Sequence, residues 1–391
     1  MKIETFALER WMTKWELLVT HDIAESGISP MSVREMLEVT RVDDPDAIIA
    51  EAMADRQLYS EARGTKALRE IIASTYDGVS ADDILVTTGA IEANFLVYNA
   101  LLDAGDHVVV TTPCYQQLVS VPRSIGCEVT EWRVTPESGF VFDLDELERL
   151  VTDRTKMIVI NSPHNPTGAY LGQAELERVA QIADSAGAWV LSDEAYRWLT
   201  HPGGAEQPAP MRDIYPRAVS IGTMSKFFGM PGLRLGWLAA TAELAEQCWG
   251  LRDYISLSPS KLSDRFAQIA IANRACIQAR NHDIIGVNLE TARRWFTENG
   301  DIVSWHEPRA GLLAMIHVHD LENTDELSER LAESGVMLAP GSAFGLPEHL
   351  RIGIGQQPEI FAEGLERAAS VIRQYRRERR LGALQPSSTL G

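Results

Sequence analysis

The sequence comprises 391 residues, of which 45% are hydrophobic and 23% are charged. Its 36 Lys and Arg residues are outnumbered by 55 Asp and Glu residues, which gives a formal net charge of -19. A chain of this length and apolar content can bury a large core, which excludes intrinsic disorder as its main state. Its acidity argues against nucleic acid as a partner, because phosphate backbones would be repelled.

Neither a membrane-spanning segment nor a secretory leader is expected. No apolar run approaches membrane-spanning length, and the start, MKIETFALERWMTKWE, has charges scattered among its apolar positions. The four cysteines form no C-x-x-C pair, and no histidine cluster has the spacing of metal ligands. We therefore expect a cytoplasmic protein that has reduced thiols, no metal site and no membrane partner.

The first twenty residues predict one short amphipathic helix. Leu8, Trp11, Trp15 and Leu18 follow one another at spacings that place them on a single helical face. The glycine and proline in Ala24–Pro30 interrupt this pattern, so we expect the helix to end before that segment.

Short β-rich runs alternate with helical stretches between about residues 65 and 240. The expected strands are Ile84–Thr88, His107–Thr112, Lys156–Asn161, Ala188–Asp193, Ala218–Thr223 and Arg234–Ala240. Several are apolar almost throughout, which is typical of strands buried on both faces of a mainly parallel sheet. Helical patterns such as Ile91–Leu102 and Ala174–Ser185 lie between them. This alternation predicts a three-layer α/β domain.

After about residue 280 the pattern indicates a smaller α+β domain. The expected elements are a helix over Asp283–Asn299, runs at Ile302–His306 and Leu312–His319, a helix near Thr324–Ser334, runs at Val336–Ala339 and Leu350–Gly355, and a helix over Pro358–Arg377. We expect residues 41–280 to form the large domain and residues 281–391 the small one. Residues 1–40 are expected to pack with the small domain, and the polar tail to fray.

Polar residues follow two of the expected strands, at the edge where open parallel sheets bind ligands. Gly89, Ala90 and Ile91 lead into a helix, where free N–H groups and the helix dipole favour an anion. Tyr115 follows the next strand. At this position both a ring-stacking role and a place in the core are open.

Three further strand ends carry more specific patterns. In HNPTG, the rigid backbone can hold the Asn165 amide against a ligand. In SDEAY, Asp193 and Tyr196 can contact two atoms of one ring. In TMSK, Lys226 lies beside hydroxyls and is followed by Arg234, and a nearby cation lowers the pKa of such an amine. An amine with a lowered pKa is a candidate nucleophile.

The motifs TTGAIEA, HNPTG, SDEAY and TMSKFFGMPGLRLGW, in this order, resemble those of the pyridoxal-phosphate (PLP) enzymes of the class I/II aminotransferase superfamily. The resemblance covers nearly the whole chain. It implies the α/β architecture of fold type I, in which a mostly parallel seven-stranded sheet lies between helices and a smaller α+β domain is attached. It also implies pyridoxal 5'-phosphate as cofactor, an α-amino acid as substrate, and a homodimer with shared active sites.

The resemblance implies roles for individual residues. Lys226 matches the lysine that forms the internal aldimine and later moves a proton at the substrate's α-carbon. Asp193 matches the carboxylate that keeps the pyridine nitrogen protonated, so that the ring can accept electrons. Asn165 and Tyr196 match the pair that hydrogen-bonds the phenolic oxygen, and Tyr115 matches the stacking aromatic. Lys226, Asp193 and Tyr196 are thus the expected catalytic residues.

Other matches concern the phosphate, the substrate and the partner subunit. Arg351, in HLRIG, matches the arginine that binds the α-carboxylate of the substrate, the alternative being a surface arginine. Tyr59 matches a tyrosine that reaches the cofactor phosphate of the partner subunit. Gly27 matches the glycine of an N-terminal segment that closes over the substrate. The residues that match the phosphate site are Gly89, Ala90, Ile91, Thr223, Ser225 and Arg234.

The resemblance leaves the reaction open. Members of the superfamily form an external aldimine with the substrate and deprotonate Cα, after which several outcomes are open. The stretches FGMPGLR and LRDY and the Trp-rich start are similar to the capreomycidine synthase group. Those enzymes take a β-hydroxylated arginine, eliminate the hydroxyl and close a guanidine ring in antibiotic biosynthesis. The alternatives are a conventional aminotransferase, a PLP-dependent arginine oxidase or hydroxylase, and a scaffold without chemistry, against which the intact Lys226, Asp193 and Arg234 argue.

Acidic residues near the N-terminal segment bear on the substrate. A guanidinium or ammonium group would pair with carboxylates, and Trp15 could supply a flat wall for it. The alternative is that these acids are solvated residues of an acidic protein. Trp198, close after the SDEAY motif, is expected to be a core residue rather than a substrate wall. The acids in question are Glu9, Glu16, Asp22 and Glu25, of which we expect Glu9, Glu16 and Glu25 to bind substrate.

Overall fold

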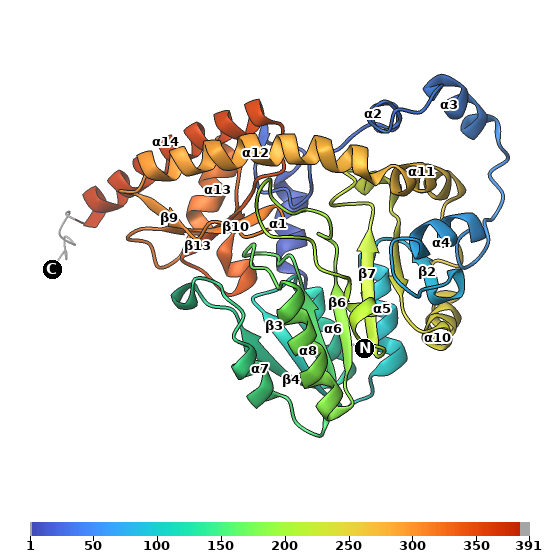
Figure 1. The fold of residues 1–391 in the computed structure, drawn as a ribbon. Helices are drawn as coiled ribbons and strands as arrows, with labels where there is room; N and C mark the ends of the chain where they lie inside the picture. Colours follow the sequence, from blue (N-terminus) through green and yellow to red (C-terminus); the bar gives the residue numbers. More distant parts are fainter. Residues whose placement is uncertain (1, 384–391) are drawn as a thin grey trace.

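Seven strands form the central sheet of the computed structural model, which describes residues 2–383 (Figure 1). In β8 the chain runs antiparallel to both neighbours, and the remaining pairings are parallel. The mostly parallel seven-stranded sheet is therefore confirmed. In order across the sheet the strands are β2 (Ile84–Thr87), β8 (Gly236–Ala239), β7 (Ala218–Thr223), β6 (Trp189–Asp193), β5 (Thr155–Asn161), β3 (His107–Thr112) and β4 (Glu128–Arg133).

Helices cover both faces of this sheet. In β5, Met157 and Val159 point to one core, whereas Ile158 and Ile160 point to the other, as the two-residue period of a strand requires. The predicted three-layer arrangement is thus confirmed. The first core includes α5 (Ala90–Leu101), α6 (Gln117–Ile125) and α10 (Ala242–Arg252); the second includes α7 (Leu144–Leu150), α8 (Gln173–Ala186) and α9 (Met211–Ile214).

A second, four-stranded antiparallel sheet is formed from the C-terminal part of residues 2–383. Its order is β12 (Ala339–Pro340), β13 (His349–Gly353), β10 (Leu313–Val318) and β9 (Val303–Trp305). The long helices α12 (Arg274–Glu298) and α14 (Pro358–Ala383) lie side by side, with α13 (Asp325–Glu333) packed on α14 (Figure 1).

The N-terminal segments contact elements near both the seven-stranded and the four-stranded sheet. The strand β1 (His21–Asp22) pairs in parallel with β11 (Val336–Met337), whereas α1 (Ala7–Trp15) also contacts the residues after β3. The helices α2 (Val33–Val39) and α3 (Pro45–Ala54) follow, and α4 (Lys66–Ala73) packs on α11 (Lys261–Ala272). The division at residues 40 and 280 stays a prediction. The short 3-10 turns are η1 (Ala81–Asp83), η2 (Pro136–Ser138), η3 (Pro231–Leu233) and η4 (Gly341–Phe344).

Several element predictions differ from the structure. The run expected at Val336–Ala339 is two short strands in different sheets, and the last helix extends to Ala383 rather than Arg377. The first helix ends at Trp15, so Leu18 lies outside it and is exposed. The buried side chains of the helix are Leu8 and Met12. The sequence does not predict β4, because this edge strand reads EVTEWR and most of its side chains are not buried. Helix α12 begins at Arg274 rather than Asp283, because the polar residues of its first turns obscure the apolar periodicity.

None of the helices within residues 2–383 is both long enough and apolar enough to cross a lipid bilayer.

Candidate functional site

A cavity of about 480 Å³ lies at the carboxyl ends of β5, β6 and β7, beside the start of α5. We call it the central cavity. It brings together residues from the N-terminal segment, the large sheet and the four-stranded sheet. The predicted site residues that line it are Glu9, Glu16, Glu25, Gly89, Ala90, Ile91, Tyr115, Asn165, Asp193, Tyr196, Thr223, Ser225, Lys226, Arg234 and Arg351.

Two predicted residues lie outside this lining. Gly27 is close by, since a Cβ at this position would lie 3.1 Å from the Ser225 carbonyl oxygen. Tyr59 is 85% exposed and is not part of the cavity of its own chain. One subunit therefore does not bring Tyr59 to the site.

Asp193 ends β6 and is buried at the floor of the cavity. One of its carboxylate oxygens, Oδ2, accepts a hydrogen bond from Asn94 Nδ2 at 2.9 Å, and Oδ1 accepts one from the Ala195 N–H at 3.1 Å. Burial raises the pKa of Asp193 despite these donors. A cationic ring nitrogen beside the carboxylate would counteract this effect. Sequence reasoning missed Asn94, whose one signal is a polar residue within the apolar helix α5.

Lys226 follows β7 and contacts the N-terminal segment. Its Nζ donates a hydrogen bond to Ser26 Oγ at 2.6 Å and lies 3.7 Å from Glu25 Oε1. Burial alone would raise the pKa of Glu25, but Lys226, the Gly27 N–H and Arg351 outweigh it and the net pKa is lowered. Glu25 is therefore ionised at neutral pH. Ser26 was not predicted, because no sequence motif links it to a lysine 200 positions away.

The start of α5 forms an anion cradle. Its N-cap is Gly89, at φ 80°, so that no side chain caps the first free N–H groups of the helix. A Cβ on Gly89 would lie 2.8 Å from Arg234 Nη2 and would displace the guanidinium, and a φ of 80° is strained for any residue with a side chain. The hydroxyls of Thr223 and Ser225 lie 3.1 Å apart in the same cavity. N–H groups, hydroxyls and a guanidinium are the donors that a phosphate requires.

Arg351, on β13, is buried rather than at the surface. Its Nη1 donates to Asn165 Oδ1 at 3.2 Å and its Nη2 donates to the Ala24 carbonyl oxygen at 2.8 Å. Burial lowers the pKa of Arg351. Its Nε has no partner among the described residues, so the guanidinium can still donate to a carboxylate ligand.

Two aromatic hydroxyls complete the lining. The Tyr115 hydroxyl donates to Glu9 Oε1 at 2.9 Å, and burial, followed by the nearby charge of Glu9, raises the pKa of Tyr115. Burial likewise raises the pKa of Tyr196. Both phenols therefore stay protonated at neutral pH and can donate hydrogen bonds.

The two tryptophans considered from the sequence lie outside the central cavity. Trp15 donates its Nε1 hydrogen to Glu329 at 3.1 Å, and Lys14 Nζ lies 4.7 Å from the centroid of its ring. The expectation that Trp15 forms a wall for a guanidinium is therefore wrong, because its ring already faces another cation. Trp198 packs against Phe227, with ring centroids 5.3 Å apart, in agreement with a core role.

Asp22 shapes the segment that carries Glu25. Its Oδ1 accepts hydrogen bonds from the N–H groups of Ala24 and Glu25, at 2.9 and 3.0 Å. Burial, followed by the nearby charge of Glu25, raises the pKa of Asp22 from 3.8 to about 6. Because the folded carboxyl holds its proton more tightly than the unfolded one, ionisation removes stability as the pH rises from 3.8 to about 6.

We expect Asp22→Asn to raise the free energy of unfolding at neutral pH by on the order of 2 kcal/mol. The amide oxygen of asparagine can accept both backbone N–H groups, and it does not ionise. Thermal unfolding across this pH range should show the wild type losing stability relative to the variant as the pH rises. Identical pH profiles for the two proteins would contradict the raised pKa of Asp22.

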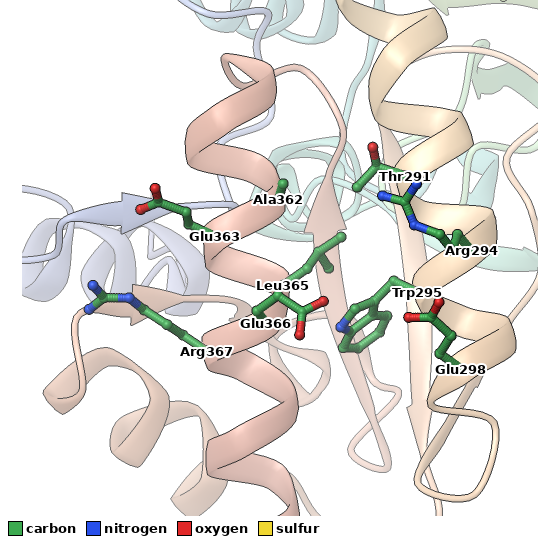
Figure 2. A pocket seen from close by; sticks show the side chains of 9 residues that line it. All are labelled: Thr291, Arg294, Trp295, Glu298, Ala362, Glu363, Leu365, Glu366 and Arg367. Atoms are coloured by element: carbon green, nitrogen blue, oxygen red, sulfur yellow. The ribbon is translucent and has the colours of Figure 1, made fainter.

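Another cleft, of about 440 Å³, opens between α12 and α14 (Figure 2). The ring of Trp295 and the side chain of Leu365 lie between the helices, and charged side chains surround them. No site residue predicted from the sequence lines this cleft. The central cavity is therefore the candidate active site.

Residues 30–368 match the model of the family "Aminotransferase class I and II". The chain belongs to this family. Capreomycidine synthase from Streptomyces vinaceus is 31% identical to this aminotransferase-family chain over 96% of this chain and 95% of that protein. The arginine–pyruvate transaminase AruH of Pseudomonas aeruginosa is 29% identical over 89% of this chain and 93% of that protein. The aspartate/prephenate aminotransferase of Thermus thermophilus is 29% identical over 80% and 83%.

Solved structures of the family share the fold. A PLP-dependent aminotransferase from Streptococcus suis aligns at a TM-score of 0.90 and 31% identity, over 96% of this chain and 99% of that one. The PLP-dependent cyclase OrfR aligns at a TM-score of 0.88 and 32% identity, over 96% and 98%. The aminotransferase-family protein described here is thus a PLP-dependent enzyme with the fold type I architecture.

Proposed function

We propose that this enzyme acts on a hydroxylated arginine, and that its reaction eliminates a β-hydroxyl group and closes a guanidine ring. The observation that carries this proposal is the presence of Glu9, Glu16 and Glu25 in the lining of the central cavity, together with Lys226. We call these three carboxylates the acidic wall.

Charge balance in the cavity supports a cationic substrate side chain. Arg234 and Arg351 fit the two anions that the family chemistry requires, namely the cofactor phosphate and the α-carboxylate of the substrate. Those pairings leave Glu9 and Glu16 without an ion-pair partner among the described residues, whereas Glu25 lies 3.7 Å from Lys226. A guanidinium supplies the missing positive charge and can donate two parallel hydrogen bonds to a carboxylate.

The names of relatives agree with this substrate class. A capreomycidine synthase, a PLP-dependent cyclase and an arginine–pyruvate transaminase all align with most of this chain. The transaminase supports a second candidate, transfer of the amino group to a 2-oxo acid, because aminotransferases align at similar identity. Lys226 and Arg351 would serve either reaction. The acidic wall therefore supports an arginine-type substrate, but it does not distinguish cyclisation from transamination.

The residues of the central cavity fit PLP. Arg234, the hydroxyls of Thr223 and Ser225, and the cradle at the start of α5 would hold its phosphate, where a Cβ on Gly89 would intrude. The buried Asp193 would hold the ring nitrogen in its protonated form. The cofactor, when bound, supplies an electron sink for a negative charge that develops at Cα.

The other cavity residues bind and orient the substrate. Asn165 and Tyr196 would donate hydrogen bonds to the phenolic oxygen, and Tyr115, fixed by Glu9, would pack on the ring face. Arg351 would hold the α-carboxylate, which fixes the direction of the Cα–H bond relative to Lys226.

In the proposed reaction Lys226 Nζ takes the proton from Cα. The Cβ–O bond breaks, and the hydroxyl leaves with a proton as water. A guanidine nitrogen then adds to Cβ and loses one of its protons, while Lys226 returns a proton to Cα. The net change is the exchange of a C–O and an N–H bond for a C–N bond and one water, without an oxidant or a 2-oxo acid.

We also infer a homodimer. Tyr59 is exposed beside Leu58, and Tyr254 and Ile255 are exposed apolar side chains as well. Exposed apolar side chains in such numbers favour burial against a second copy. In that assembly Tyr59 would reach the phosphate of the partner subunit, and each active site would contain residues of both chains.

Neutralising the acidic wall tests the substrate class. We expect Glu9→Gln, Glu16→Gln and Glu25→Gln each to raise the KM for arginine-type substrates about tenfold, because each variant removes a charged partner of the guanidinium. The KM for β-hydroxycitrulline, the neutral isostere of β-hydroxyarginine, should change much less. Steady-state kinetics of the wild type and of each variant give the KM for both compounds.

Glu4→Gln serves as the control, because Glu4 lies on the same N-terminal segment, accepts a hydrogen bond from Ser120 and does not line the cavity. If the wall variants changed the KM of β-hydroxyarginine and β-hydroxycitrulline equally, the acidic wall would not recognise a guanidinium.

A further inference from the structure

We infer that Arg252 is a positioning residue that ties the phosphate cradle at the start of α5 to the chain segment carrying Tyr59. The inference rests on the proposed function, since it concerns how this enzyme retains PLP and how its two active sites are shared. Arg252 lies at the end of α10, outside the lining of the central cavity.

The Arg252 guanidinium is completely buried and holds two separate segments. Its Nε donates to Ser256 Oγ at 3.0 Å, and its Nη1 donates to the Ala62 carbonyl oxygen. The Arg252 carbonyl oxygen accepts the N–H of Ile255 at 2.8 Å. One side chain thus fixes both the turn after α10 and the segment that follows Tyr59.

The same guanidinium faces the cradle through Glu92. Glu92 is buried, and its Oε2 lies 3.8 Å from Arg252 Nε. That oxygen also accepts the N–H of Thr88, the residue before Gly89. The position of the turn from β2 into α5 therefore depends on Glu92, and Glu92 depends on Arg252 for the compensation of its buried charge.

The three segments that meet at Arg252 are the ones that the shared site requires. The turn at Thr88 leads into the N–H groups of Ala90 and Ile91, and Ala62 lies close after Tyr59 in the chain. The turn after α10 carries Tyr254, whose side chain is 92% exposed. Loss of Arg252 should therefore loosen the PLP cradle and the dimer surface together.

The test compares Arg252→Met with Arg376→Met. Arg376 is a matched control, because it is also a buried arginine that joins separate segments. It lies on α14 and donates hydrogen bonds to the Asp301 carbonyl oxygen and to the Asp320 carboxylate. The full-length proteins are freed of cofactor and titrated with PLP, followed by the visible spectrum of the bound cofactor. The dimer dissociation constant and the unfolding temperature of the cofactor-free proteins are measured in parallel.

We expect Arg252→Met to weaken PLP binding about tenfold or more, and to weaken dimerisation, because buried hydrogen bonds to both segments are lost. Arg376→Met should lower the unfolding temperature but keep the PLP dissociation constant within about twofold of the wild type. Arg252→Lys, which keeps a charge beside Glu92, should recover part of the PLP affinity.

Glu92→Gln covers the case in which Arg252→Met does not fold. Its amide oxygen can still accept the Thr88 N–H, but the charge that faces Arg252 is gone, so PLP binding should weaken without loss of the fold. Wild-type PLP affinity in both Arg252→Met and Glu92→Gln, or equal losses in the Arg376→Met control, would overturn the inference. A wild-type protein that binds no PLP would instead overturn the proposed function.

Discussion

Lys226→Ala is expected to lower turnover by at least about 10³-fold, because the variant loses the amine that attaches the cofactor and moves the Cα proton. Borohydride treatment of the wild type should fix PLP covalently to Lys226, as peptide mass spectrometry would show, whereas the variant should release all of its PLP on denaturation. The fold should persist, since Lys226 Nζ contacts Ser26 and Glu25 rather than core residues.

Lys156→Ala is the matched control, because Lys156 is exposed on β5. It should retain wild-type turnover and wild-type labelling. Full activity in Lys226→Ala, or covalent PLP at another lysine of the wild type, would contradict the assignment.

Asp193→Asn is expected to lower kcat by about 10²-fold or more, because an amide does not keep the ring nitrogen of the cofactor protonated. Burial raises the pKa of Asp193, which means that its ionised form is disfavoured in the cofactor-free protein. The cofactor-free variant should therefore unfold at the same temperature as the wild type or at a higher one. Kinetics and thermal unfolding together separate this result from misfolding.

Two findings would count against this role of Asp193. One is a variant whose kcat equals that of the wild type. The other is a variant in which activity and the stability of the cofactor-free protein fall together, because that pattern would indicate a structural carboxylate.

The sequence predicts best the elements whose signal is local. The strands His107–Thr112 and Ala218–Thr223 are predicted at their observed bounds. The first is almost entirely β-branched, and in the second β-branched residues alternate with small ones. Edge strand β4 escapes this reasoning because its side chains are largely polar. Helix ends are also poorly defined, and Leu18 shows that an apolar residue at helical spacing need not belong to the helix.

The residues of the candidate site likewise fall into those that local sequence predicts and those that it does not. Residues within motifs at strand ends, such as Asp193 and Lys226, are found from the sequence because the parallel sheet brings strand ends to one edge. Asn94 and Ser26 are not, since each acts across a long stretch of chain on a residue of another segment. Trp15 is a residue that the sequence suggested for substrate binding, but its side chain contacts Glu329 and Lys14 instead.

The most direct test of the proposed function is to incubate the purified, PLP-loaded enzyme with β-hydroxyarginine and no 2-oxo acid, while product masses and the cofactor's visible spectrum are followed. Our proposal predicts repeated turnover, loss of one water per substrate molecule, and a cofactor spectrum that returns to its starting form. A single stoichiometric conversion of the cofactor to its aminated form, reversed only by adding a 2-oxo acid, would contradict the cyclase proposal and identify a transaminase.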